Sequence, residues 1–314
     1  MKKFIIKSIA YVVLILLILE GLVRILHLYD EDPPRFIDEA GVEKRIPGNE
    51  GISVTGNRIQ NHARFHINKF GYNSFREFIP TDTDKEIALI GDSFIQGFHI
   101  DYTNSIGKKI EDQLPQYKVF EFGYAGYDLA DQLYLIHAYD SIFKAIDDVI
   151  IYVHYPDDLY RDDYEPNQDR VNMLNSPLFK IRDEIKLLSY ASAIGLVDPI
   201  KEAILSIRSS GHTEVHDEIS DSEKIASYLR NIESLFTKFP PPAQKTAFLI
   251  DGEHCAPEIV SLLKSKGYPV IDYSGAFAQS EKPVTLIYDQ HWNENGRKII
   301  ARCISEYINS KKSD

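Results

Sequence analysis

The chain has 314 residues, which is enough for one large domain or two small ones. Hydrophobic residues make up 44% of the sequence and charged residues 26%, a composition typical of a globular protein with a substantial core. The formal net charge of -12 argues against a nucleic-acid partner, because an acidic surface repels phosphate backbones. The same charge disfavours electrostatic attraction to an anionic membrane, so any membrane attachment has to be hydrophobic.

An apolar segment near the N-terminus, residues 4–26, carries charge only at Lys7, Glu20 and Arg24. As a helix it would extend roughly 35 Å, enough to cross a hydrocarbon core of about 30 Å. Three lysines in the first seven residues favour a cytoplasmic N-terminus. We therefore expect residues 1–28 to form a single-pass anchor in the lipid bilayer, with the remaining chain outside the cytoplasm. A cleaved signal peptide is the alternative, although no small-x-small cleavage pattern follows the apolar segment.

Two regions follow the expected anchor. Residues 29–80 begin with a stretch rich in charge, proline and glycine, Asp30 to Asn57, which is typical of a linker or loosely packed loop. A short strand and turn over residues 66–72 would lead from it into the core. Residues 81–314 are expected to form the main domain.

Short apolar runs alternate with helically spaced segments through the main domain. The predicted strands are 87–90, 118–122, 149–153, 246–250 and 270–273, and the predicted helices are 105–114, 129–143, 259–266 and 293–308. This alternation predicts the α/β class, with a parallel sheet of about five strands covered on both faces. A long insertion at about 157–239 has an acidic, tyrosine-rich start and two or three helical stretches. It either shapes a substrate site or is a plain helical excursion.

The sequence Ile90-Gly91-Asp92-Ser93-Phe94 places a serine directly after a predicted buried strand. This arrangement would expose the hydroxyl at the carboxyl edge of the sheet, where active sites form. A serine nucleophile needs a general base, and the base needs a carboxylate to orient it. Asp289 and His291, just before the last predicted helix, supply both groups. Ser93, His291 and Asp289 are therefore the predicted catalytic residues.

The chain resembles the SGNH/GDSL hydrolase superfamily, from about residue 87 to the C-terminus. Gly91-Asp92-Ser93-Phe94 is similar to the family's nucleophile block, and Phe122-Gly123-Tyr124-Ala125-Gly126-Tyr127 is similar to its second block. Asp289-x-His291-Trp292-Asn293 is similar to its last block. The resemblance implies a flavodoxin-like three-layer α/β/α sandwich. It also implies an oxyanion hole formed by backbone N–H groups of Ser93 and Gly126.

Two positions depart from the family pattern. Asp157 stands where the third block normally has an asparagine that completes the oxyanion hole, and Glu121 replaces an asparagine of the second block. An ionised carboxylate at position 157 would oppose a developing oxyanion, whereas a protonated one could donate to it. Asp289 and His291 are two residues apart, rather than three as in simpler esterases of the family. The chain is most similar to the membrane-tethered members of the family and to the alginate-type O-acetyltransferases. The closer spacing of Asp289 and His291 resembles the O-acetyltransferase branch and favours acyl transfer to or from a glycan.

Other polar residues are weaker candidates. Asp92 is expected to brace the serine turn, Trp292 to pack under His291, and His99 to lie in a loop. His154 ends the third predicted strand as either a structural or a functional histidine. Asp251, Glu253 and His254 form a polar cluster whose loose spacing argues against a metal site. Two cysteines, Cys255 and Cys303, fit no zinc or redox motif, and one disulfide and two free thiols both remain open.

The sequence thus predicts a serine esterase that acts without a cofactor on an ester, with acetyl on a cell-envelope carbohydrate as the expected substrate. Two alternatives stay open. One is an O-acetyltransferase acting on an exported polysaccharide, and the other is a non-catalytic glycan-binding or scaffold protein that retains the fold.

Overall fold

The main domain contains a five-stranded parallel sheet, as the sequence predicts. The computed structural model describes residues 1–56, 61–196 and 220–311. The strand order in the sheet is β6-β5-β7-β8-β9, which is the 2-1-3-4-5 order of flavodoxin-like folds. Each of the five runs predicted as strands is a strand: β5 (Lys85–Gly91), β6 (Tyr117–Gly123), β7 (Asp148–Tyr152), β8 (Thr246–Ile250) and β9 (Val270–Asp272).

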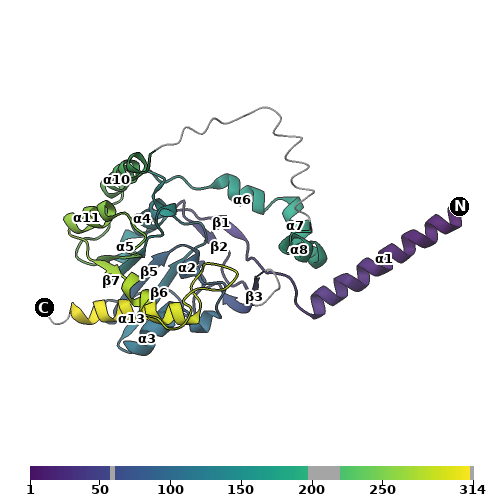
Figure 1. Cartoon of the computed structure of the whole chain (residues 1–314), viewed down its shortest axis with the longest axis horizontal. Helices are drawn as coiled ribbons and strands as arrows, with labels where there is room; N and C mark the ends of the chain where they lie inside the picture. Colours follow the sequence, from purple (N-terminus) through teal and green to yellow (C-terminus); the bar gives the residue numbers. More distant parts are fainter. Residues whose placement is uncertain (57–60, 197–219, 312–314) are drawn as a thin grey trace.

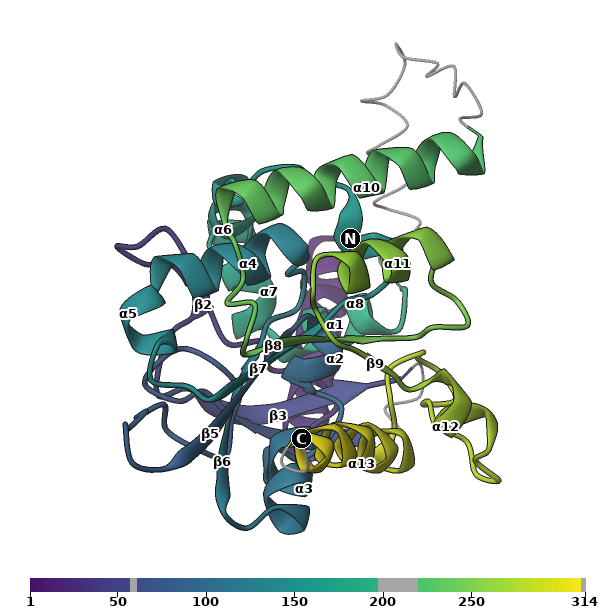
Figure 2. The ribbon, with the colours of Figure 1, turned by 90° about the vertical axis from the view of Figure 1, so that its left-hand side faces the viewer.

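Helices cover both faces of the sheet, which confirms the three-layer α/β/α arrangement (Figures 1 and 2). On one face lie α4 (Leu129–Ala138), α10 (Asp221–Lys238) and α11 (Pro257–Ser265). On the other lie α3 (Ile106–Gln113) and α13 (Glu294–Ser310). Each face has its own hydrophobic core, so the central strands are buried on both sides. This explains why their sequences are continuous apolar runs rather than alternating ones.

Local caps fix where the helices of these layers begin. Asp128 and Asp131 form a reciprocal capping box at the start of α4, and Ser220 and Glu223 do the same for α10. The prediction of one helix over 129–143 is wrong in one respect. The structure has two helices there, α4 and α5 (Asp140–Phe143), which are separated at Tyr139. The Tyr139 hydroxyl is engaged by the N-terminal region, where it accepts from Lys44 Nζ at 2.7 Å.

The N-terminal helix α1 (Lys2–Ile25) projects away from the domain (Figure 1). Its 24 residues correspond to about 36 Å, and its apolar side chains are exposed apart from Val23. Within the described ranges it is the one helix long and apolar enough to cross a membrane. The predicted transmembrane helix is therefore confirmed as a candidate span.

The expectation of a loosely packed loop over Asp30 to Asn57 is wrong. The described part of this stretch contains β1 (Arg35–Ile37), β2 (Glu43–Arg45) and β3 (Glu50–Thr55), and Asn57 lies outside the described residues. β1 pairs with β2, and β3 pairs with β4 (Asn61–His66), both antiparallel. β2 is fully buried although all three of its residues are charged. Composition suggested solvent exposure, but these charges are paired within the fold.

The predicted insertion at 157–239 contains more helices than expected. Residues 197–219 lie outside the described residues, and the rest contains four α-helices rather than two or three. They are α10 and three shorter ones, α6 (Gln168–Leu174), α7 (Pro177–Glu184) and α8 (Lys186–Ala193). The remaining short helices are α2 (Ser93–Gln96), η1 (Tyr102–Asn104), η2 (Asp157–Leu159) and α12 (Ser274–Ala278). Both cysteines of the chain are free thiols.

Candidate active site

Ser93 lies in a sharp turn at the carboxyl end of the central strand β5. Asp92 caps the one-turn helix α2, its carboxylate accepting from the Phe94 N–H at 2.8 Å. The end of β6 packs directly on this helix, because a Cβ on Gly123 would lie 2.0 Å from the Gln96 backbone nitrogen. The glycine and the cap together hold Ser93 at the edge of the sheet, as the sequence predicts.

A buried arginine supports this turn from helix α13. Arg297 is inaccessible to solvent, and its Nη2 donates to the Phe94 carbonyl at 2.6 Å. Gly97 ends α2 with a left-handed φ of 65°, and a Cβ there would lie 2.4 Å from Arg297 Nη2. Only a residue without a side chain therefore leaves room for the guanidinium. The turn that contains Ser93 and the C-terminal helix α13 are consequently fixed to each other.

His291 and Asp289 meet Ser93 from the loop that precedes α13. His291 Nε2 lies 2.7 Å from Ser93 Oγ, and its Nδ1 is hydrogen-bonded to Asp289 Oδ1. The same carboxylate oxygen accepts from the His291 backbone N–H at 2.9 Å. The loop is closed by an isolated antiparallel bridge between Thr285 and Trp292. This serine–histidine–aspartate chain has the connectivity that nucleophilic acyl transfer requires.

The electrostatics of this serine–histidine–aspartate arrangement favour a neutral imidazole as a proton acceptor. Burial lowers the pKa of His291, an effect partly offset by Asp289. Burial by itself would raise the pKa of Asp289, but hydrogen bonds from the His291 backbone and ring hold it below its usual value. At neutral pH the His291 imidazole is therefore uncharged and the Asp289 carboxylate is ionised.

His99 lies against the face of the His291 ring, with ring centroids 3.9 Å apart. It is buried, and burial holds its pKa well below the usual value of 6.5, so it adds no charge beside His291. Donor atoms of His99, Asp289 and His291 lie within 4.8 Å of one another. However, the two imidazoles face each other, and Asp289 already binds His291. The arrangement thus fits ring positioning better than metal coordination.

The loop after β6 contains Gly126, whose φ is +95°. Among the described residues, neither the Ser93 N–H nor the Gly126 N–H has a hydrogen-bond partner. Arg35 Nη1 donates to the Ala125 carbonyl at 3.2 Å, which is the other end of the peptide group that carries the Gly126 N–H. Arg170 occupies the space of the missing side chain, since a Cβ on Gly126 would lie 2.2 Å from its Nη1. Two arginines therefore fix the orientation of this peptide.

Both arginines meet a buried carboxylate on β2. Arg170 Nη2 donates to Glu43 at 2.6 Å, Arg35 Nη1 lies 3.9 Å from the same group, and the Tyr124 hydroxyl donates to it. Because Glu43 accepts from Tyr124 in the Gly126 loop, the N-terminal strands and the insertion helix α6 both support the loop next to Ser93.

The two departures from the family pattern have different surroundings. The Asp157 side chain is 65% exposed, and its carboxylate lies 3.8 Å from His154 Nδ1. The next residue, Asp158, is buried and accepts from the His154 backbone N–H at 2.8 Å. Glu121 is fully buried, which raises its pKa to about 7, and it accepts from the Gly107 N–H at 2.9 Å. Asp157 therefore lies at the solvent-exposed edge of the site, whereas Glu121 is a buried residue that packs against α3.

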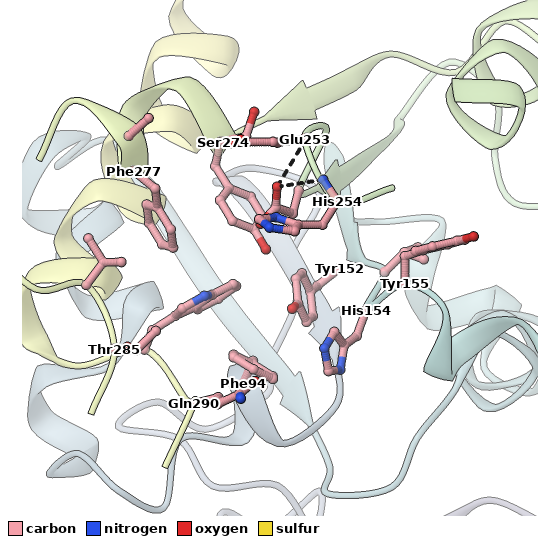
Figure 3. Close-up of a pocket in the computed structure, with 16 residues that line it drawn as sticks. Phe94, Tyr152, His154, Tyr155, Glu253, His254, Ser274, Phe277, Thr285 and Gln290 are labelled. Carbon is pink, nitrogen blue, oxygen red and sulfur yellow. Dashed lines mark hydrogen bonds and ion pairs between the residues drawn. The ribbon is translucent and has the colours of Figure 1, made fainter. Parts of the chain in front are cut away.

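A pocket of about 650 Å³ lies next to the triad, and Figure 3 shows the side chains of its wall. It is lined by Phe94 and Gln290, the neighbours of Ser93 and His291, and by His154 at the end of β7. Aromatic rings and polar side chains share its wall, which suits a ligand with both polar and apolar faces. The wall also includes Asp251, whose carboxylate lies 3.0 Å from His254 Nδ1.

Several other predicted residues also have defined places. Asp92 braces the serine turn, and burial raises its pKa to about 7. Trp292 is buried and packs edge-on against Phe94 and Tyr152, so it is a packing residue. Sequence reasoning missed Arg35, Arg170 and Arg297. No local pattern marks them, because each acts on a residue more than 40 positions away.

Known proteins resemble this chain only in structure. No protein-family model matches it, and no curated protein sequence does. One similar structure is a lipase/acylhydrolase from Enterococcus faecalis, with 13% identity, coverage of 72% of this chain and 96% of that chain, and a TM-score of 0.41. Another is a member of the lipolytic protein G-D-S-L family from Veillonella parvula, with 13% identity, coverage of 72% and 98%, and a TM-score of 0.37.

A third similar structure is a mutant of an acetyl-xylooligosaccharide esterase from Geobacillus, with 13% identity, coverage of 73% and 96%, and a TM-score of 0.38. The similar structures are thus lipolytic proteins and esterases. At these identities and TM-scores the likeness supports no conclusion about activity, which depends on the geometry of the site.

Proposed function

We propose that the chain is a membrane-anchored serine esterase in which Ser93 is the nucleophile, His291 the general base and Asp289 the group that orients it. The observation that carries the proposal is the 2.7 Å separation of Ser93 Oγ and His291 Nε2, with Asp289 on the opposite ring nitrogen. A nucleophile within hydrogen-bond reach of a base, with a third group orienting that base, is the arrangement that activates a serine.

The proposed reaction has two steps. His291 Nε2 takes the Ser93 proton while Oγ attacks the ester carbonyl carbon, and the tetrahedral intermediate forms. His291 then gives the proton to the leaving alcohol, and an acyl-Ser93 ester remains. In the second step His291 deprotonates a water molecule, which attacks the acyl carbon of the acyl-enzyme. The bond between this carbon and Ser93 Oγ then breaks, His291 returns the proton to Oγ, and the acid is released.

The oxyanion of both intermediates is proposed to bind the backbone N–H groups of Ser93 and Gly126. Their lack of other partners within the described chain supports this role, as does the peptide orientation imposed by Arg35. Asp157, the third predicted member of the oxyanion hole, has an exposed carboxylate. The variant Asp157→Asn measures its contribution.

The substrate is proposed to be an acylated carbohydrate, with acetyl as the acyl group. The pocket beside the triad supports this choice, because polar groups such as Asp251 and aromatic rings such as Tyr273 line the same cavity. Residues 4–26 are proposed to anchor the protein in the bilayer, with the N-terminus cytoplasmic and the catalytic domain outside. α1 supports this location through its length and apolar surface.

An O-acetyltransferase is the second candidate, and the two-residue spacing of Asp289 and His291 favours it. The acyl-enzyme would be the same, but a sugar hydroxyl would replace water in the second step. The two candidates differ in product: free acetate for the esterase and an acylated glycan for the transferase.

Fluorophosphonate labelling of the full-length chain in nanodiscs tests the proposal. Wild-type protein is expected to be labelled, and Ser93→Ala is expected not to be. Ser105→Ala is a suitable control, because this serine caps α3 away from the triad. A folded wild-type protein that is not labelled would refute the activated serine and favour a non-catalytic glycan-binding or scaffold role. Acetate release measured on an acetylated oligosaccharide, with and without an added acceptor glycan, then separates the esterase from the transferase.

A further inference from the structure

The helices α7 and α8 form a hairpin that contacts the anchor helix rather than the core of the domain (Figure 1). Neither helix has a buried residue, and the hairpin lies beside the C-terminal end of α1. A helical hairpin with no buried face needs some other surface to cover its apolar side chains.

Specific polar contacts fix this hairpin to α1. Glu20 accepts from the first-turn backbone N–H groups of α8, from Lys186 at 3.1 Å and from Leu187 at 2.7 Å. Arg24 donates from Nη2 to the Glu184 carbonyl at the end of α7, at 2.6 Å. The two charges inside the apolar N-terminal run therefore satisfy the otherwise unpaired backbone groups at the corner of the hairpin.

The same contacts set the height of the hairpin relative to a bilayer. Glu20 lies five residues before the C-terminal end of α1, about 8 Å along its axis. If α1 spans a hydrocarbon core of about 30 Å, this position falls at the outer boundary between acyl chains and headgroups. The hairpin must then lie at that boundary, because its corner is bonded to Glu20 and Arg24.

Apart from those of α1, the exposed large apolar residues of the described chain gather on the hairpin and the residues next to it. Beyond α1, twelve large hydrophobic residues are exposed in the described parts of the chain, and seven of them lie between residues 173 and 196. Leu178 is 78% exposed, Leu196 67% and Ile181 52%, with Ile185 and Leu188 beside them. Such clustering next to a membrane-spanning helix is typical of an interfacial helix pair rather than of a solvated surface.

We infer that the hairpin of residues 177–193 lies in the outer interface of the bilayer, as a second membrane contact that fixes the catalytic domain at one height and tilt. This inference depends on the proposed anchoring by α1. The hairpin carries nearly balanced charge, with Lys180, Arg182 and Lys186 against Asp183 and Glu184, so the contact is apolar and independent of lipid charge. α6 directly precedes the hairpin and contains Arg170, which packs on Gly126. It thereby links the membrane contact to the active site.

The test uses the full-length chain in lipid vesicles, with single cysteines labelled by an environment-sensitive fluorophore. Cys255→Ala and Cys303→Ala remove the native thiols, and Leu178→Cys and Ile181→Cys place the label on the hairpin. Leu16→Cys within α1 is the control for a membrane-embedded site. Ser261→Cys on α11, an exposed position on the far side of the domain, is the control for a solvated one. Lipids with a nitroxide at a shallow acyl carbon quench any label that enters the interface.

Quenching and blue-shifted emission at Leu178 and Ile181, with none at Ser261, are the expected results. Quenching at Leu16 without quenching at Leu178 and Ile181 would overturn the inference and mean that a protein or solvent covers the hairpin. Absence of quenching at Leu16 as well would refute the anchor and the inference together. Fluorophosphonate labelling and a thermal melt of the same samples report independently on the catalytic proposal and on folding.

Discussion

Replacing Arg35 tests whether the N-terminal strands take part in catalysis. Its Nη1 donates to the Ala125 carbonyl at 3.2 Å and to the Tyr124 hydroxyl at 3.3 Å. A donor on a peptide carbonyl holds that peptide in one orientation and strengthens the N–H at its other end as a donor. Here that N–H belongs to Gly126, the proposed oxyanion ligand. We therefore expect Arg35→Met to weaken transition-state binding without changing the triad.

The size of the effect follows from the contact. A hydrogen bond from a charged donor contributes about 1.5–3 kcal/mol, and tenfold in rate corresponds to about 1.4 kcal/mol. Arg35→Met should therefore lower kcat by about 10- to 100-fold, with KM little changed. Loss of an entire oxyanion donor costs about 10²–10³-fold, which sets the upper limit. Folding should survive, because Glu43 keeps the hydrogen bonds from Arg170 and Tyr124.

The assay is hydrolysis of p-nitrophenyl acetate by the full-length chain in nanodiscs, with thermal melts in parallel. Arg64→Met is the matched control, because Arg64 also lies on an N-terminal strand but is paired with Asp101 at the surface. An unchanged kcat in a folded Arg35→Met protein would refute the role of the Ala125 carbonyl contact. A loss of kcat that merely follows a lower melting temperature would assign Arg35 to stability alone.

Three further predictions concern charge. Because burial lowers the pKa of His291, and the base must be neutral, the acid limb of the pH–rate profile should have its midpoint below pH 6.5; a midpoint above 7 would refute this. Asp157→Asn should accelerate fluorophosphonate labelling by no more than about fivefold, since an exposed charge acts through water with about 1 kcal/mol or less; a hundredfold gain would place Asp157 inside the oxyanion hole. Glu121 has its pKa raised to about 7 by burial, so the folded state keeps a proton that the unfolded chain releases near pH 4.5, and stability falls as the pH rises between these values. Urea unfolding at pH 5 and pH 8 measures this loss of unfolding free energy. In Glu121→Gln the loss should be smaller than in wild type by on the order of 1–3 kcal/mol. A loss in Glu121→Gln as large as in wild type and in the surface variant Glu306→Gln would refute the prediction.

Where the sequence interpretation succeeded, the signal was local. The runs at 87–90 and 246–250 are continuous and apolar because parallel strands covered on both faces have no polar side. The start of the last predicted helix, at residue 293, is likewise set by residues that are neighbours in the sequence. Asn293 accepts from the Gly296 N–H and thereby caps the first turn of α13.

The prediction of a loosely packed loop failed because charged residues, which usually indicate solvent exposure, are buried there. Glu43, Lys44 and Arg45 read as a solvated stretch, yet they form a buried strand. Lys44 lies 2.9 Å from Asp38, and Arg45 donates to the Pro33 carbonyl at 2.6 Å. Charged side chains can be buried when such partners are present, and the partners cannot be identified before the chain has folded.

The sequence by itself determined the order of strands in the five-stranded sheet region, the apolar N-terminal helix and the identity of Ser93, Asp289 and His291 as candidates. The strands and the N-terminal helix follow from the spacing of apolar side chains. The three candidates follow from their residue types and from their positions next to predicted elements. The tertiary structure alone decided that Arg35 holds the Ala125 carbonyl, that His99 packs against the His291 ring and that Glu20 caps α8. These contacts join residues between 90 and 192 positions apart, and their partners are selected by how packed elements meet rather than by any pattern along the chain.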